Sequence, residues 1–267
     1  MTTKLASVAL CAAALVASPI HAQIFEVIHP DVEEGGIEFE ILNTIIADSV
    51  DAGEERSVHE FAIGYAPFSF WKTTVAFEAA TIKEEGAELE AFEWENVFLA
   101  PIGSHGHDHD HDHDHDHGGS FFELGALGLY FAMEVPRDGG ISNGGMEIGP
   151  IAEFDLGPVE TITNLFVEVP FVDDEDPGLA YAISAAVPVY ESGGMEVAAG
   201  FESFGGVEGL FGDTTPLGDN SFVLGPSVYF GFDAGEGREI EPRLAVLFGM
   251  TDGAPDTAIS LNFEFKY

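Results

Sequence analysis

The chain is poor in cysteine and in basic residues. Its single cysteine, Cys11, lies within the first 22 residues, so the rest of the chain has neither a thiol nor a disulfide. Lysine and arginine number 8 against 48 aspartates and glutamates, which gives a formal net charge of −40. Such a surface repels nucleic acid and attracts cations, so we expect no nucleic-acid partner.

The chain also lacks an apolar run of the ~20 residues that a helical membrane span needs, which excludes a helical membrane protein. The first 22 residues combine Lys4 with an apolar stretch and Pro19. This layout is typical of a secretory signal peptide, so we expect residues 1–22 to be removed. No linker-like composition divides the remainder, and we interpret residues 23–36 as a periplasmic N-terminal segment that precedes one structural unit.

Most of the remaining chain alternates apolar and polar residues with period two, which indicates β-strands with one apolar and one wet face. At the end of the chain, for example, Ile259 and Leu261 alternate with Ser260 and Asn262. The runs are roughly ten residues long, the length with which a tilted strand crosses a bilayer. About twelve strands are predicted, at 37–47, 58–66, 71–81, 90–99, 121–134, 145–156, 159–170, 179–189, 195–204, 222–232, 239–249 and 257–267.

The last strand carries the most specific pattern, Leu261-x-Phe263-x-Phe265-x-Tyr267. With it, residues 37–267 resemble the bacterial outer-membrane β-barrel proteins, which typically end in an aromatic residue preceded by alternating apolar ones. The resemblance implies an all-β fold, a single antiparallel transmembrane β-barrel surrounded by outer-membrane lipid. It also implies that the barrel-assembly machinery recognises the C-terminal strand. The alternative is a soluble periplasmic β-barrel or sandwich whose apolar faces meet in an internal core.

Residues 104–119, SHGHDHDHDHDHDHGG, form a ribbon in which histidine alternates with aspartate. Imidazole is a good ligand for Zn, Ni, Cu and Co, and carboxylate can complete the coordination shell. A flexible loop is not preorganised, so we expect loosely bound, exchangeable divalent ions and no organic cofactor. The alternative is a solvated low-complexity insert. The predicted ligands are His105, His107, Asp108, His109, Asp110, His111, Asp112, His113, Asp114, His115, Asp116 and His117.

The strand count predicts the side of the membrane on which this ribbon lies. In an even-stranded barrel with both chain ends in the periplasm, the first connection is external and the second periplasmic. The ribbon belongs to the fourth connection, between predicted strands 90–99 and 121–134. It is therefore predicted to be periplasmic.

If the apolar faces meet lipid, the opposite faces line the lumen with carboxylates. Few basic residues, mainly Lys72, Arg243 and Lys266, share these faces. A lumen of this charge is expected to be hydrated and to favour cations. The predicted cation path comprises Glu60, Glu78, Glu147, Glu153, Asp155, Glu168, Glu202 and Glu241.

These features predict an outer-membrane barrel that passes or handles divalent transition-metal cations, with the ribbon as a metal trap. The alternative is a non-conducting structural or surface barrel whose ribbon only buffers metal. We expect no enzyme, because the chain has neither Gly-x-Ser-x-Gly nor His-Glu-x-x-His. Ser57 and His59 are close in sequence, but their spacing is common by chance. His29 could add a metal ligand on the periplasmic side, and His59 opens a strand, but both are interpreted as ordinary polar residues.

Overall fold

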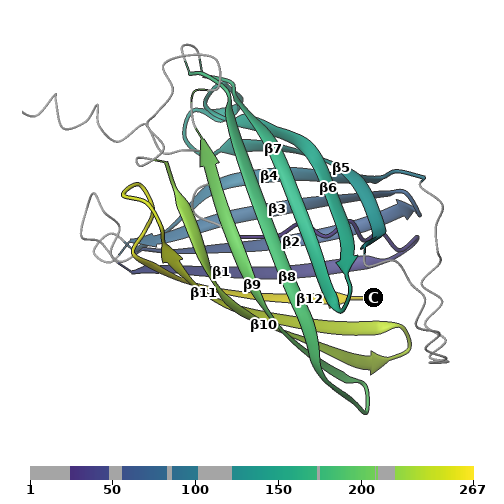
Figure 1. The fold of residues 1–267 in the computed structure, drawn as a ribbon. Helices are drawn as coiled ribbons and strands as arrows, with labels where there is room; N and C mark the ends of the chain where they lie inside the picture. The colour runs from purple at the N-terminus through teal and green to yellow at the C-terminus, as the bar shows by residue number, and fades with distance from the viewer. Residues whose placement is uncertain are drawn as a thin grey trace, which may run out of the picture.

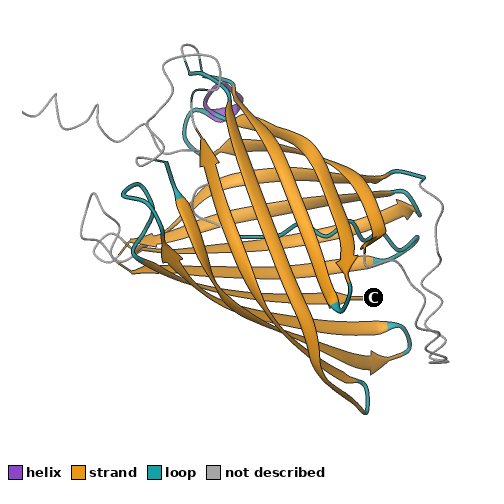
Figure 2. Ribbon diagram, in the orientation of Figure 1, coloured by secondary structure: helices purple, strands orange, loops and turns teal. Residues whose placement is uncertain are grey.

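A computed structural model describes residues 25–47, 56–82, 86–101, 122–172, 175–207, 209 and 220–267. These residues form one closed barrel of antiparallel strands, shown in Figures 1 and 2. The all-β barrel predicted from the alternation is therefore confirmed, including its twelve strands. No helix in the described ranges is long and apolar enough to cross a membrane. The elements are β1 (Ile37–Ala47), β2 (Arg56–Phe68), β3 (Trp71–Ile82), β4 (Gly86–Leu99), β5 (Phe122–Pro136), the 3-10 helix η1 (Gly140–Asn143), β6 (Gly145–Leu156), β7 (Val159–Pro170), β8 (Gly178–Ser192), β9 (Met195–Val207), β10 (Phe222–Gly235), β11 (Arg238–Gly249) and β12 (Thr257–Lys266).

The barrel closes between its first and last strands. The amide of Ile37 donates to the carbonyl of Tyr267 at 3.0 Å, and the amide of Tyr267 donates to the carbonyl of Ile37 at 2.9 Å. The pairing of β1 with β12 continues to Ala47, opposite Thr257. Each described strand therefore has a neighbour on both sides, which satisfies the backbone without help from solvent.

Several strands extend beyond their predicted limits. β8 and β9 are joined by Gly193 and Gly194, whose φ angles of 62° and 79° suit a two-residue hairpin turn. The ladder between these strands includes the pair Glu191 and Glu196, close to the turn. Both residues are polar, so the ladder of backbone hydrogen bonds continues toward the turn beyond the point where the apolar alternation ends. Strand ends are thus set by turn chemistry, which the apolar pattern does not mark.

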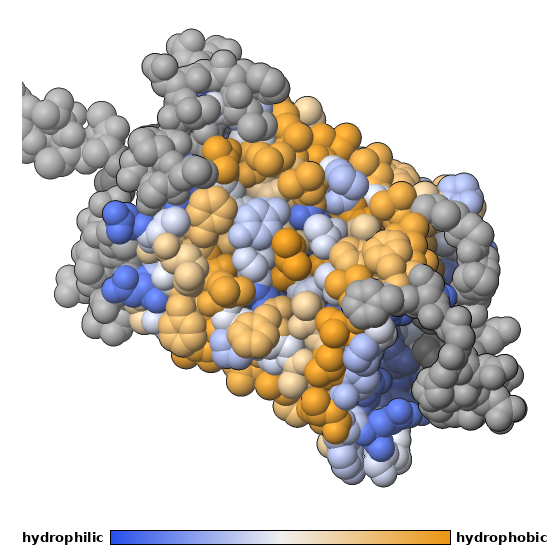
Figure 3. Space-filling view, viewed as in Figure 1, coloured by the Kyte–Doolittle hydropathy of each residue, from blue (hydrophilic) through white to orange (hydrophobic). Residues whose placement is uncertain are grey.

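The outer faces of the strands carry large exposed apolar side chains. Phe61, Ile63 and Phe77, from β2 and β3, are each about half exposed. Figure 3 shows apolar residues over the wall of the barrel and hydrophilic residues gathered toward its ends. A soluble barrel presents the opposite arrangement, whereas a barrel in lipid needs an apolar outer band.

Aromatic residues gather on the outer face near the barrel end that holds Tyr267. The rings of Phe68 and Phe70 stack with centroids 5.5 Å apart, and those of Trp71 and Phe98 stack at 6.2 Å. Aromatic girdles lie at the membrane–water interfaces of transmembrane barrels. This cluster therefore marks the position expected for one membrane interface.

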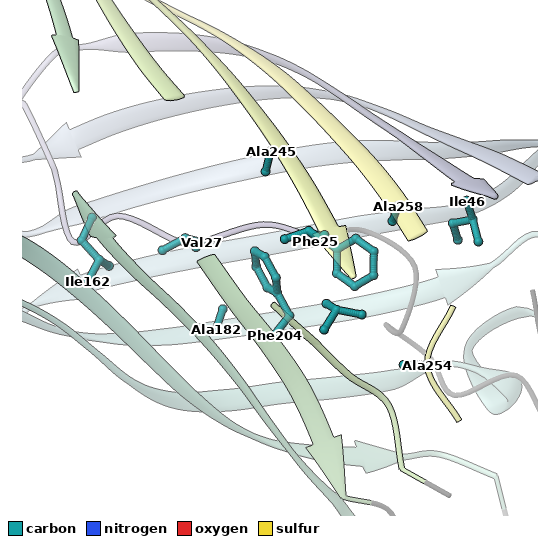
Figure 4. Packing of buried hydrophobic residues seen from close by; sticks show 11 residues of the cluster. Phe25, Val27, Ile46, Ile162, Ala182, Phe204, Ala245, Ala254 and Ala258 are labelled. Atoms are coloured by element: carbon teal, nitrogen blue, oxygen red, sulfur yellow. The ribbon is translucent and has the colours of Figure 1, made fainter. Parts of the chain in front are cut away.

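Residues 25–32 lie inside the barrel. Phe25 and Val27 are buried in an apolar cluster with inward-facing wall residues, among them Ile162 and Phe204 (Figure 4). The rings of Phe25 and Phe204 have centroids 5.3 Å apart. The apolar side chains of this segment are thus shielded from water by the barrel wall.

The chain leaves the lumen by a turn before β1. Gly35 has a φ of 86° there, and its amide donates to the carbonyl of Ala66 at 2.7 Å. Residues 23–36 were predicted to form a periplasmic segment that precedes the barrel. Residues 25–32 pack in the lumen against residues that are distant in the sequence, and the periplasmic assignment of the segment stays a prediction.

Candidate functional site

The inner faces of the strands carry the carboxylates predicted as a cation path. Glu60, Glu147 and Glu202 are buried there. The other five predicted residues follow the same alternation on their own strands, and Asp155 is exposed near the end of β6. The role of these residues in cation passage stays a prediction. The five are Glu78, Glu153, Asp155, Glu168 and Glu241.

Within the described ranges, two groups of three carboxylates could each hold a metal ion. In each group, the potential ligand oxygens lie within 4.8 Å of one another. Carboxylate oxygens at such separations suit hard divalent cations, and they repel one another when no cation is present. The first group is Glu60, Glu93 and Glu95, and the second is Glu38, Glu40 and Glu264.

The predicted cation path included one member of the first group and none of the second. Glu93 and Glu95 alternate with Phe92 and Trp94, which are exposed on the outer face of β4. The period-two pattern was therefore sufficient to place both glutamates in the lumen. What the pattern lacked was the register that brings them next to Glu60.

Basic side chains of the lumen are already engaged in ion pairs. Lys72 Nζ lies 2.6 Å from Glu38 Oε2, and Lys266 Nζ lies 3.0 Å from Glu241 Oε2. Between described residues, no ion pair reaches Glu60, Glu93 or Glu95. A cation that binds this first group would therefore not have to displace any described basic side chain from these carboxylates.

Polar side chains of the wall hold the N-terminal segment in place. The fully buried Asn164 accepts from the amide of Ile28 and donates to its carbonyl, both at 2.8 Å. The guanidinium of Arg243 donates to the carbonyl of Phe25 at 2.6 Å. These bonds satisfy backbone groups that have left the strand ladder. The segment is thus docked by directed contacts as well as by apolar packing.

A cavity of ≈ 220 Å³ lies between this segment and the wall. The segment contributes Glu26 and His29 to its lining, and the wall contributes carboxylates from both groups. The cavity is large enough for several water molecules or a hydrated cation, and its polar lining offers them hydrogen bonds. The members of the two groups that line the cavity are Glu40 and Glu264 of one group and Glu95 of the other.

The predicted metal ligands between His105 and His117 lie outside the described residues. The strands that flank them are described. By the antiparallel order, β4 ends and β5 begins at the barrel end that holds Tyr267. Metal binding by this ribbon and its side of the membrane stay predictions.

No protein-family model matches the chain, and no curated protein matches it either. Among solved structures, it is similar to an outer-membrane channel from Pseudomonas putida F1, with 10% identity, a TM-score of 0.53 and coverage of 94% of this chain and 98% of that one. The fold is that of an outer-membrane β-barrel. At this identity, the likeness shows the fold alone.

Two other solved barrels have lower scores. The translocator domain of the autotransporter NalP from Neisseria meningitidis shares 10% identity at a TM-score of 0.49, covering 88% of both chains. Outer-membrane phospholipase A from Escherichia coli shares 8% identity at 0.40, covering 88% of this chain and 97% of that one.

Replacing Asn164 with leucine is expected to loosen the N-terminal segment. The substitution leaves the amide and carbonyl of Ile28 without their partner, at a cost of about 1–3 kcal/mol for each buried group. Hydrogen exchange at the Ile28 amide should become faster, while the amides of β12 stay protected. Thr163→Val, on the outer face of the same strand, serves as the control. Equal protection of Ile28 in both variants would contradict this role of Asn164.

Proposed function

We propose that the protein is a barrel of the bacterial outer membrane whose acidic lumen binds and passes divalent cations, including transition metals such as Zn, Ni, Cu or Co. The N-terminal segment closes this lumen until it is displaced. The observation that carries the proposal is the first carboxylate group, Glu60, Glu93 and Glu95, inside a closed barrel.

The wall of the barrel supports a membrane location. Hydrogen bonding between neighbouring strands satisfies the backbone around the closed sheet, which is the condition for strands in hydrocarbon. The apolar outer band and the aromatic cluster near Tyr267 match the surface that lipid requires. Both features follow from alternation in the sequence and do not depend on the lumen.

The arrangement of the lumen supports cation passage. Glu95 belongs to the first carboxylate group and Glu40 to the second, and both line the same cavity. A cation held by one group therefore lies close to the other. Adjacent sites of moderate affinity are what conduction requires, because an ion must be able to leave as well as to enter.

The His/Asp ribbon supports the choice of transition metals, since imidazole ligates these ions well. On the predicted periplasmic side it would retain ions near the exit of the lumen. The second candidate is a non-conducting barrel whose ribbon buffers metal, and the presence of residues 25–32 in the lumen favours it. In either case we propose that the assembly machinery recognises the C-terminal strand.

Titration calorimetry with Zn and Ni separates the two proposed sites. Deletion of residues 105–117 should remove binding that weakens from pH 7.5 to pH 5.5, because only neutral imidazole binds metal. The triple variant Glu60→Gln, Glu93→Gln, Glu95→Gln should remove a different component and leave the ribbon's contribution intact.

The control for this titration neutralises exposed acids instead. Its substitutions are Glu191→Gln, Glu236→Gln and Asp252→Asn, all at exposed positions. Equal binding by this control, the deletion and the triple glutamine variant would mean that diffuse surface charge attracts the metal. That result would overturn both proposed sites.

A further inference from the structure

The outer face of the barrel carries a serine, a histidine and an asparagine in hydrogen-bond contact. Ser57 and His59 lie two residues apart on β2 and therefore share a face. Asn43 on β1 lies directly opposite His59 in the strand register. Ser57 Oγ is 3.2 Å from His59 Nε2, and His59 Nδ1 is 2.8 Å from Asn43 Oδ1.

The contact with Asn43 determines the tautomer of the imidazole. A carbonyl oxygen can only accept a hydrogen bond, so His59 Nδ1 carries the proton and donates it to Asn43 Oδ1. Nε2 is then left with a lone pair, which accepts from the Ser57 hydroxyl. Nucleophile, general base and orienting group thus lie in the order that serine hydrolases require.

The surroundings of this group are apolar. Ile45 and Phe61, which flank it on β1 and β2, are 51% and 53% exposed on the outer face. In the strand register, Ile259 pairs with Ile45 and Leu261 pairs with Asn43. Acyl chains of lipids can lie along such a wall. The serine is therefore placed to meet ester groups of lipids and not soluble substrates.

The position along the barrel agrees with this class of substrate. Ser57 is the second residue of β2, and β2 begins at the barrel end opposite Tyr267. A side chain near the end of a transmembrane strand lies toward the interfacial region, where ester groups join acyl chains to lipid head groups. A nucleophile at mid-wall would face hydrocarbon without such groups.

We propose that Ser57 and His59 are catalytic residues, and Asn43 a positioning residue, of a site that hydrolyses carboxylic esters of membrane lipids. Ser57 Oγ attacks the ester carbonyl carbon while His59 Nε2 takes the hydroxyl proton. The bond to the lipid alcohol breaks, and the alcohol leaves with that proton. Water then attacks the acyl-serine ester and gives its proton to Nε2. The carboxylic acid is released as this proton returns to Ser57 Oγ, so ester and water yield alcohol and acid.

The first test uses the full chain in mixed micelles of detergent and diacyl phosphatidylethanolamine, with released fatty acid as the readout. In the unsubstituted chain, a fluorophosphonate should label Ser57, and mass spectrometry identifies the labelled residue. Ser57→Ala should lower the rate of hydrolysis by about 10³-fold or more. Ser203→Ala is the control, because Ser203 contacts the hydroxyl of Tyr181 at 3.0 Å instead of an imidazole.

The second test concerns Asn43. Asn43→Leu should lower kcat by about 10²-fold, because the imidazole of His59 loses its orientation. KM should stay unchanged, because the surface that binds the lipid is kept. Asn43→Asp keeps an acceptor for Nδ1–H and should recover most of the rate. Absence of fluorophosphonate on Ser57, or hydrolysis by the full chain no faster than by Ser57→Ala, would overturn the proposal. Either result would leave the lumen untouched, so it would not bear on cation passage.

Discussion

Deletion of residues 23–32 is expected to open the lumen, so that the barrel conducts cations. The deleted stretch includes Phe25 and Val27, which pack among apolar residues of the wall. Strand β1 begins at Ile37, so closure of β1 on β12 does not depend on the deleted residues. In planar lipid bilayers, the deletion variant should give discrete current steps where the full chain gives few. In a salt gradient, the reversal potential should show preference for cations.

A companion variant separates opening from selectivity. The deletion combined with Glu60→Gln, Glu93→Gln and Glu95→Gln should still conduct, but with weaker preference for cations, because the first carboxylate group has lost its charge. If the simple deletion gives no current although its mobility in gels shows a folded barrel, passage through the lumen is disproved. The barrel would then be non-conducting, with metal buffering left to the ribbon.

Alternation was sufficient to predict the barrel because each strand separates two different environments. In β12, Ala258 and Ser260 are buried in the lumen, whereas Ile259 between them is exposed on the outer wall. A shift of one residue would reverse both faces, so the pattern determines which side of the strand meets lipid. This information is local in sequence and is repeated in every strand.

The N-terminal segment could not be predicted in this way. Its main polar contact joins Ile28 to Asn164, which are 136 residues apart. Asn164 lies within an alternating strand, and its sequence context resembles that of other inward polar residues. Only the folded barrel shows that the side-chain amide of Asn164 faces the backbone of Ile28, whose hydrogen-bonding groups have no partner in the strand ladder.

The proposed ester-hydrolysing site could not be predicted from the sequence either. The strand predicted at 58–66 included His59 and left Ser57 outside, whereas β2 begins at Arg56 and places both residues on one face. Even together, these two residues include no orienting group. Asn43 becomes opposite to His59 only through the register of β1 with β2. Register depends on the intervening turn and on the whole sheet, so sequence spacing alone favoured a chance pair.

Replacement of Arg243 by leucine is expected to cause the largest loss of stability. Arg243 Nε lies 3.5 Å from Glu202 Oε1, and the Glu202 side chain is fully buried. Removal of one partner leaves a buried charge without its counter-ion, which typically costs about 3–5 kcal/mol. The variant also loses the hydrogen bond to the carbonyl of Phe25. The free energy of unfolding, measured by urea titration in lipid vesicles, should fall accordingly.

The double variant Arg243→Leu, Glu202→Gln tests the cause of this loss. It removes both charges and keeps an oxygen that can accept from the Tyr229 hydroxyl, which donates to Glu202 Oε1 at 2.7 Å in the native chain. Most of the stability should return, because no uncompensated charge remains. Arg137→Leu is the control, since Arg137 pairs with Glu88 on the exposed surface and its removal should change stability little. If Arg243→Leu unfolds at the same urea concentration as that control, the Glu202 pair does not support the barrel, and the wall must owe its stability to the strand ladder and apolar packing.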